Sequence, residues 1–327
     1  MMWLTWRQFR AHALVAGVTL ALLAAYLVWL GLRIRHSYEI NVECGVGCSV
    51  ETARGILERS YSTSLQVAGL MVILAPALIG AFWGAPLIAR EFETGTHRFI
   101  WSQSITRTRW LAVKLLFTTL VGVAVTGALS VMLTWAASPY DALIDQRFQP
   151  LFFPTRNVAP LGYAAFAVVA GTAIGLLARR TVLAMAITLA AFALLQIVVP
   201  TVIRPHLQPV VTESVTLDPT ASFDALGVGP QGVHIHGYSL PGAWVLSEDG
   251  LLRDGAGNPL TQQQVEQCQR GNPAEDLACL AELGAHFEVS YQPADRYWTF
   301  QWLEFGGYLV LAGALAGFTF WRIRRTG

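Results

Sequence analysis

Long apolar segments alternate with shorter polar ones along most of the chain. A hydrocarbon core about 30 Å thick is crossed by roughly 20 apolar residues in a helix. Six segments meet this requirement, and they lie at about Ala13–Leu32, Leu65–Ile88, Leu111–Trp135, Leu161–Ala178, Val182–Ile203 and Phe305–Trp321. The pattern therefore predicts an all-α polytopic membrane protein with six transmembrane helices.

The composition agrees with this class of protein. Of the 327 residues, 54% are hydrophobic and 13% are charged, whereas about a quarter of the residues in a soluble domain are charged. We therefore expect membrane lipid around most of the chain, and we expect no nucleic-acid partner.

The distribution of charge predicts the orientation, because cytosolic loops of membrane proteins carry an excess of Lys and Arg. An even number of spans places both termini on one side. With a cytosolic N-terminus, the cytosolic segments contain only Glu91 and Glu93 as acids. Their basic residues are Arg7, Arg10, Arg90, Arg98, Arg107, Arg109, Lys114, Arg179, Arg180, Arg322, Arg324 and Arg325. The sequence thus predicts a multi-pass protein of the plasma membrane with both termini in the cytoplasm.

Three of the segments outside the predicted spans have patterns that allow further predictions. Residues Met1–Arg10 alternate aromatic and basic residues at near-helical spacing, which is typical of an amphipathic helix in the membrane interface. The alternative is that they form the start of the first span. The other two, His36–Ser64 and the longer segment Arg204–Gln301, are predicted to lie on the extracytoplasmic side. A loop of the latter length without structure of its own is uncommon, so we expect a small α+β lobe there.

Within this lobe we expect short helices near Thr261–Arg270 and Ala274–Leu283 and a strand near His286–Tyr291. The predicted domain boundaries follow. Residues 1–203 contain the N-terminal helix and spans one to five, 204–303 form the extracytoplasmic lobe, and 304–327 form the sixth span and a basic tail.

All four cysteines fall in the segments that are predicted to be extracytoplasmic, which favours disulfides over reactive thiols. The preferred pairing is local, Cys44 with Cys48 and Cys268 with Cys279. Pairing between the two segments is the competing arrangement, and a metal site at the C-x-x-x-C sequence is a weaker alternative.

His234 and His236 would share one face of a strand and could supply two metal ligands. Glycines and a proline surround them, so a loop with two incidental histidines is the favoured interpretation.

The sequence shows no means of catalysis or of self-powered transport. It contains no G-x-x-x-x-G-K-[ST], G-x-S-x-G or H-E-x-x-H motif. The predicted spans contain no buried Asp, Glu, Arg or His, whereas ion-coupled carriers usually need such groups within the membrane. We therefore expect no enzyme activity in this chain and an energy source in another subunit. Gly171 and Gly175 in the fourth span would allow close helix approach, unless their spacing is chance.

The polar stretch Gly84–Lys114 is the largest predicted cytosolic segment. Its residues Glu93–Thr96 predict a helix end or tight turn, since Gly accommodates a positive φ. The basic and apolar residues that follow, Arg98–Trp101, form either a partner-binding surface or an anchor in the lipid headgroup layer.

This stretch resembles the elbow after the second span of ABC-2-type export permeases, which reads R-E-x-E-x-G-T-x-x-[FLY]. The number of spans, the cytosolic termini and the interfacial N-terminal helix also resemble that family. The segment from Tyr291 to Glu304 is similar to a Y-x-P-x-x-R-x-W-x-x-Q-x-x-E pattern of actinobacterial members.

The resemblance implies a coupling helix that docks into a groove of a separate ABC ATP-binding subunit. The residues on or beside that helix would be Arg90, Glu91, Glu93, Thr94, Gly95, Thr96, Arg98, Phe99 and Trp101. It further implies a working unit of two permease chains, as a homodimer, and two ATP-binding subunits. ATP and Mg would be bound by those subunits, and this chain would hold no cofactor or metal.

The expected function is therefore that of the transmembrane permease subunit of an ABC exporter. The alternative is a membrane sensor or immunity scaffold whose extracytoplasmic lobe binds a ligand without transport.

Overall fold

The computed structural model of the chain describes residues 2–42, 49–95, 106–217, 223, 225–247, 249–268 and 271–325. The chain divides into two compact units. The first, here called the membrane unit, contains Met1–Asp145, Pro150–Val199 and Thr299–Gly327. The second, here called the lobe, contains Gln146–Gln149 and Pro200–Trp298.

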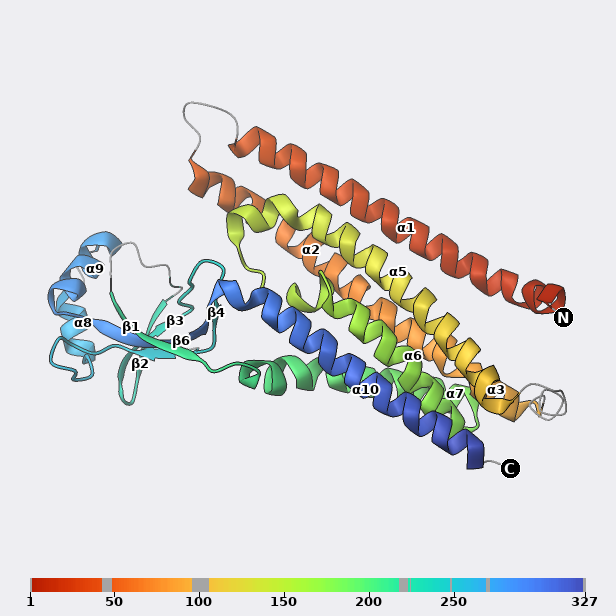
Figure 1. The fold of residues 1–327 in the computed structure, drawn as a ribbon. Helices are drawn as coiled ribbons and strands as arrows, with labels where there is room; N and C mark the ends of the chain where they lie inside the picture. Colours follow the sequence, from red (N-terminus) through yellow and green to blue (C-terminus); the bar gives the residue numbers. More distant parts are fainter. Residues whose placement is uncertain are drawn as a thin grey trace. The chain divides into compact units, whose positions relative to one another are not determined.

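Long helices make up most of the membrane unit (Figure 1). Their bounds are α1 Met2–Val42, α2 Val50–Ile79, the π-helix η1 Gly80–Gly84, α3 Pro86–Glu93, α5 Arg107–Ile144, the short η2 Phe153–Thr155, α6 Ala159–Ala178, α7 Thr181–Val198 and α10 Tyr297–Arg325. In the described part of the chain, six helical stretches are long and apolar enough to cross a membrane. The predicted fold class is thereby confirmed. The second stretch combines α2, η1 and α3.

Several helices extend beyond the predicted spans. Helix α1 includes the predicted interfacial segment without a break, so the prediction of a separate interfacial helix is wrong, and residues 2–10 form the start of the first helix. Helix α2 begins at Val50, where the Ser49 hydroxyl accepts a hydrogen bond from the Thr52 N–H at 3.1 Å. The segment His36–Ser64 is therefore mostly helical. The reason is that Ala53 and Leu57, four residues apart on one helix face, are both buried.

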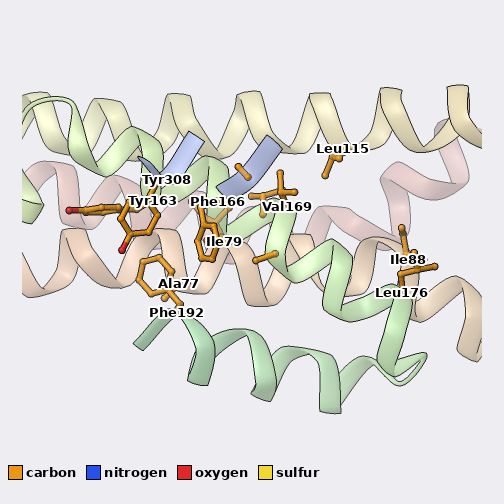
Figure 2. Packing of buried hydrophobic residues seen from close by; sticks show 14 of the residues in the cluster. Ala77, Ile79, Ile88, Leu115, Tyr163, Phe166, Val169, Leu176, Phe192 and Tyr308 are labelled. Carbon is orange, nitrogen blue, oxygen red and sulfur yellow. The ribbon is translucent and has the colours of Figure 1, made fainter. Parts of the chain in front are cut away.

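Helix α6 is the central helix of the membrane unit. Within its most apolar window 78% of the residues are buried, as expected for a helix that is apolar on all sides. Figure 2 shows side chains of α6 packed against residues from other helices, with Tyr163 beside Tyr308 of α10. Their ring centroids are 4.7 Å apart.

Glycines allow the backbones of η1 and α6 to touch. A Cβ atom at Gly171 would lie 2.4 Å from the Gly80 oxygen, and one at Gly175 would lie 2.4 Å from the Ala85 oxygen. The Thr172 hydroxyl donates to the Gly84 oxygen at 3.2 Å, which adds a polar contact between the same two segments. The close approach predicted from the glycine spacing is therefore confirmed.

The described residues of the lobe form two antiparallel three-stranded sheets, with strand orders β1-β6-β4 and β2-β3-β5. The strands are β1 Val211–Thr216, β2 Ala225–Gly229, β3 Gly232–His236, β4 Trp244–Val245, β5 Asp249–Leu251 and β6 His286–Gln292. The helices are η3 Val199–Ile203, which begins one residue before the lobe, η4 Arg204–His206, α8 Gln262–Cys268, α9 Pro273–Glu282 and η5 Ala294–Arg296.

Helices α8 and α9 and strand β6 confirm the three elements predicted in the lobe. A disulfide joins Cys268 to Cys279, as the local pairing predicts. Cys44 and Cys48 lie outside the described residues.

The prediction of a loop around His234 and His236 is wrong, because both residues belong to β3. The alternating residues Val233 and Ile235 are each 1% exposed. Burial of these two side chains in the lobe core favours a strand despite the flanking glycines.

Candidate functional site

The candidate coupling surface begins where α3 ends. The Thr94 N–H and hydroxyl both donate to the Arg90 oxygen, at 2.9 and 2.8 Å. Gly95 follows with a φ of 71°, a left-handed conformation that glycine adopts without steric cost. The helix end that was predicted here is therefore present.

Glu93 connects the end of α3 to α7. Its Oε2 atom accepts hydrogen bonds from the Thr181 N–H at 3.0 Å and the Thr181 hydroxyl at 2.6 Å. The first N–H groups of a helix lack intrahelical partners and favour a negative charge nearby. Arg180, the residue before α7, makes no side-chain capping bond. Glu93 thus caps α7 from a different helix.

The two preceding residues attach the same end of α3 to further elements. Glu91 forms an ion pair with Lys114 of α5. The Phe92 ring lies 5.4 Å from the guanidinium carbon of Arg179, the residue after α6. Three consecutive side chains therefore hold the end of α3 against α5 and against the turn between α6 and α7.

The described residues of the predicted coupling set differ in exposure. Arg90, Glu93 and Thr94 are exposed, whereas Glu91 and Gly95 are half-buried. The remaining four residues lie outside the described residues: Thr96, Arg98, Phe99 and Trp101.

A second helix N-terminus is capped in the same way by Gln301 of α10, which is fully buried. Its Oε1 atom accepts from the N–H groups of Ala159 at 3.0 Å and Val158 at 3.3 Å. Its Nε2 atom donates to the Phe153 oxygen at 3.0 Å. Val158, the residue before α6, makes no side-chain capping bond. Gln301 therefore supplies the missing acceptor for α6.

Ionisable side chains are buried near this capped end, which corrects the expectation that the spans contain none. Glu304 of α10 is 4% exposed and accepts a hydrogen bond from the Tyr163 hydroxyl. The predicted span began at Phe305, one residue too late to include it. Arg156 is 3% exposed and pairs with Asp141 of α5.

Polar residues of the segment from Tyr291 to Glu304 form hydrogen bonds in both units. In the lobe, the Tyr291 hydroxyl donates to Glu213 Oε2 at 2.9 Å. This bond to a carboxylate raises the pKa of Tyr291. Arg296 donates to the Pro209 oxygen at 2.6 Å. Gln301 and Glu304 make their contacts within the membrane unit.

The capping contacts of Glu93 and Gln301 were missed at the level of sequence, although a signal exists. Ser, Thr, Asp and Asn are the usual N-cap residues, yet α6 and α7 follow Val158 and Arg180. A helix start without a local cap requires an acceptor from elsewhere. Only the tertiary structure identifies which one. The described part of the chain contains no group of three or more His, Cys, Asp or Glu side chains arranged to hold a metal ion.

These features define a polytopic helical membrane protein whose central helices are capped by side chains from neighbouring spans. Residues 17–204 match the model of a family described as ABC-2 membrane transporter related. This match covers more than half of the chain, so the chain belongs to that family. Comparisons with the curated proteins and with the solved structures gave no match.

Proposed function

We propose that the chain is the permease subunit of an ABC exporter and that a separate ATP-binding subunit drives it. Membership of the ABC-2 related family supports pairing with such a subunit. In this proposal ATP and Mg belong to the partner, and two permease chains work with two ATP-binding subunits.

The single observation that carries the mechanism is the attachment of α3 to α7 through Glu93 and Thr181. A partner that displaces the end of α3 pulls on the N-terminus of α7 through these bonds. The Glu91–Lys114 ion pair passes the same displacement to α5. Movement of one short helix is thereby distributed over two spans.

The proposed orientation puts this end of the membrane unit in the cytosol. The described basic residues at the ends of α3, α5 and α6 include Arg90, Arg109, Arg179 and Arg180, and excess positive charge favours the cytosolic side. Arg90, which is exposed, offers the partner a cationic contact beside the capping bonds.

The experiment compares Glu93→Ala with Thr181→Pro, which removes both donors to Glu93 at the first position of α7, where proline is tolerated. The full chain is purified with its ATP-binding subunit, reconstituted in lipid, and assayed for permease-stimulated ATP hydrolysis. If Glu93 acts by holding α7, both variants reduce the stimulation, and the double variant reduces it no further than Glu93→Ala alone. Residues that act through one interaction are non-additive in this way.

The Thr181 variant is the matched control. It distinguishes an effect of Glu93 through α7 from direct contact between Glu93 and the ATP-binding subunit. If Glu93 binds the ATP-binding subunit itself, Thr181→Pro leaves the stimulation intact, which would contradict the route through α7. Unchanged stimulation in both variants would contradict the coupling role of Glu93, whereas a purified chain that binds no ATP-binding subunit would contradict the coupling function as a whole. The sensor alternative predicts the latter result.

A further inference from the structure

His234 and His236 lie on the outer face of β3. Residues two apart in a strand point to the same side of a sheet, and the alternating residues Val233 and Ile235 fill the lobe core. Both histidines are half-buried, and their rings are stacked with centroids 6.5 Å apart and an interplanar angle of 24°.

The neighbouring strand leaves space for these rings. A Cβ atom at Gly227 of β2 would lie 2.4 Å from His236 Nε2, and one at Gly229 would lie 3.2 Å from His234 Nε2. Both Nε2 atoms therefore extend over β2 in the same direction. Glycine weakens a strand interior and often marks a place where a ligand approaches the backbone closely.

We propose that His234 and His236 form a binding site for a divalent transition-metal cation of the Zn²⁺, Cu²⁺ or Ni²⁺ class. Neutral imidazole nitrogen is a preferred ligand for these ions. Metal–nitrogen bonds of about 2.0–2.1 Å require the two Nε2 atoms to come within about 4.2 Å of each other. The ring centroids are 6.5 Å apart, so metal binding requires the half-buried rings to rotate toward each other above the glycines, and water completes the coordination.

This site is independent of the proposed transport function. It involves only residues of the lobe, and neither histidine takes part in the capping contacts of the membrane unit. Binding at this site would make the lobe a sensor or carrier of metal ions rather than a passive segment.

The test uses the full chain, purified without a polyhistidine tag, treated with EDTA and reconstituted in lipid nanodiscs. Cu²⁺ alone is titrated and followed by electron paramagnetic resonance. We expect one equivalent to bind with the splitting of two imidazole nitrogens and to be displaced by Zn²⁺. His234→Gln and His236→Gln should each weaken binding at least about tenfold and remove one nitrogen from the spectrum.

Two further variants make the result specific. His206→Gln is the matched control, because His206 is an exposed lobe histidine whose Nδ1 contacts the Val202 oxygen at 2.8 Å. It should bind Cu²⁺ as the unmodified chain does. Gly227→Val retains both imidazoles but displaces the His236 ring, so it should also weaken binding.

Three outcomes would overturn the proposal. The first is that His234→Gln and His236→Gln bind Cu²⁺ with the affinity of the unmodified chain. The second is that His206→Gln loses as much affinity as those two variants, and the third is unchanged binding in Gly227→Val. Thermal melting of each variant verifies that the lobe remains folded.

Discussion

Replacing Gln301 with leucine tests whether capping from another helix stabilises the membrane unit. Leucine has a similar size, but it removes the acceptor for the N–H groups of Val158 and Ala159 and the donor to the Phe153 oxygen. Leaving a buried polar group unsatisfied costs about 1–3 kcal/mol. The bonds to the Ala159 N–H and to the Phe153 oxygen are 3.0 Å long, whereas the bond to the Val158 N–H is 3.3 Å long. We therefore count the full cost of an unsatisfied group for the first two bonds. Leucine recovers part of this through apolar contact, and we expect a net destabilisation of about 2–4 kcal/mol.

Gln196 of α7 provides the matched control. In the described part of the chain its Nε2 atom is buried without a hydrogen-bond partner. Gln196→Leu therefore removes an unsatisfied amide and should change the free energy of unfolding by less than about 1 kcal/mol or raise it.

The assay is reversible unfolding of the full chain in mixed micelles by increasing dodecyl sulfate, with circular dichroism as the readout. A loss in Gln301→Leu no greater than that in Gln196→Leu would refute the assignment of Gln301 as a stabilising cap.

Two further predictions address the packing and the orientation of the membrane unit. Gly171→Ala should destabilise the unit by about 1–3 kcal/mol, because the new methyl group would overlap the Gly80 oxygen. Gly313→Ala on α10, where no atom lies within 4 Å of the added Cβ, should be neutral or slightly stabilising in the same assay. Cysteine introduced at the exposed Arg109 should react with a membrane-impermeant maleimide only after cells are permeabilised, whereas cysteine at Gln263 in the lobe should react in intact cells. The reverse pattern would contradict the proposed cytosolic elbow.

Much of the candidate site was predictable because its signals are local. The turn after α3 follows from Gly95, and the short link Arg179–Arg180 requires α6 and α7 to be neighbours in a hairpin. Gly171 and Gly175 indicated close packing, although not that η1 would be the partner. The histidine pair was interpreted wrongly because the flanking glycines obscured the alternation of Val233 and Ile235.

The sequence by itself determined that this protein has six membrane-spanning helices, a lobe with a local disulfide, and a polar elbow after the second span. These properties depend on segment length, apolar content and nearby residues, all of which can be counted along the chain. The tertiary structure decided that Glu93 caps α7 and that Gln301 caps α6. Those contacts join residues 88 and 142 positions apart. Which side chain caps each helix depends on which helices pack side by side. A cap is needed because a helix N-terminus without an acceptor has a high free energy in an apolar environment.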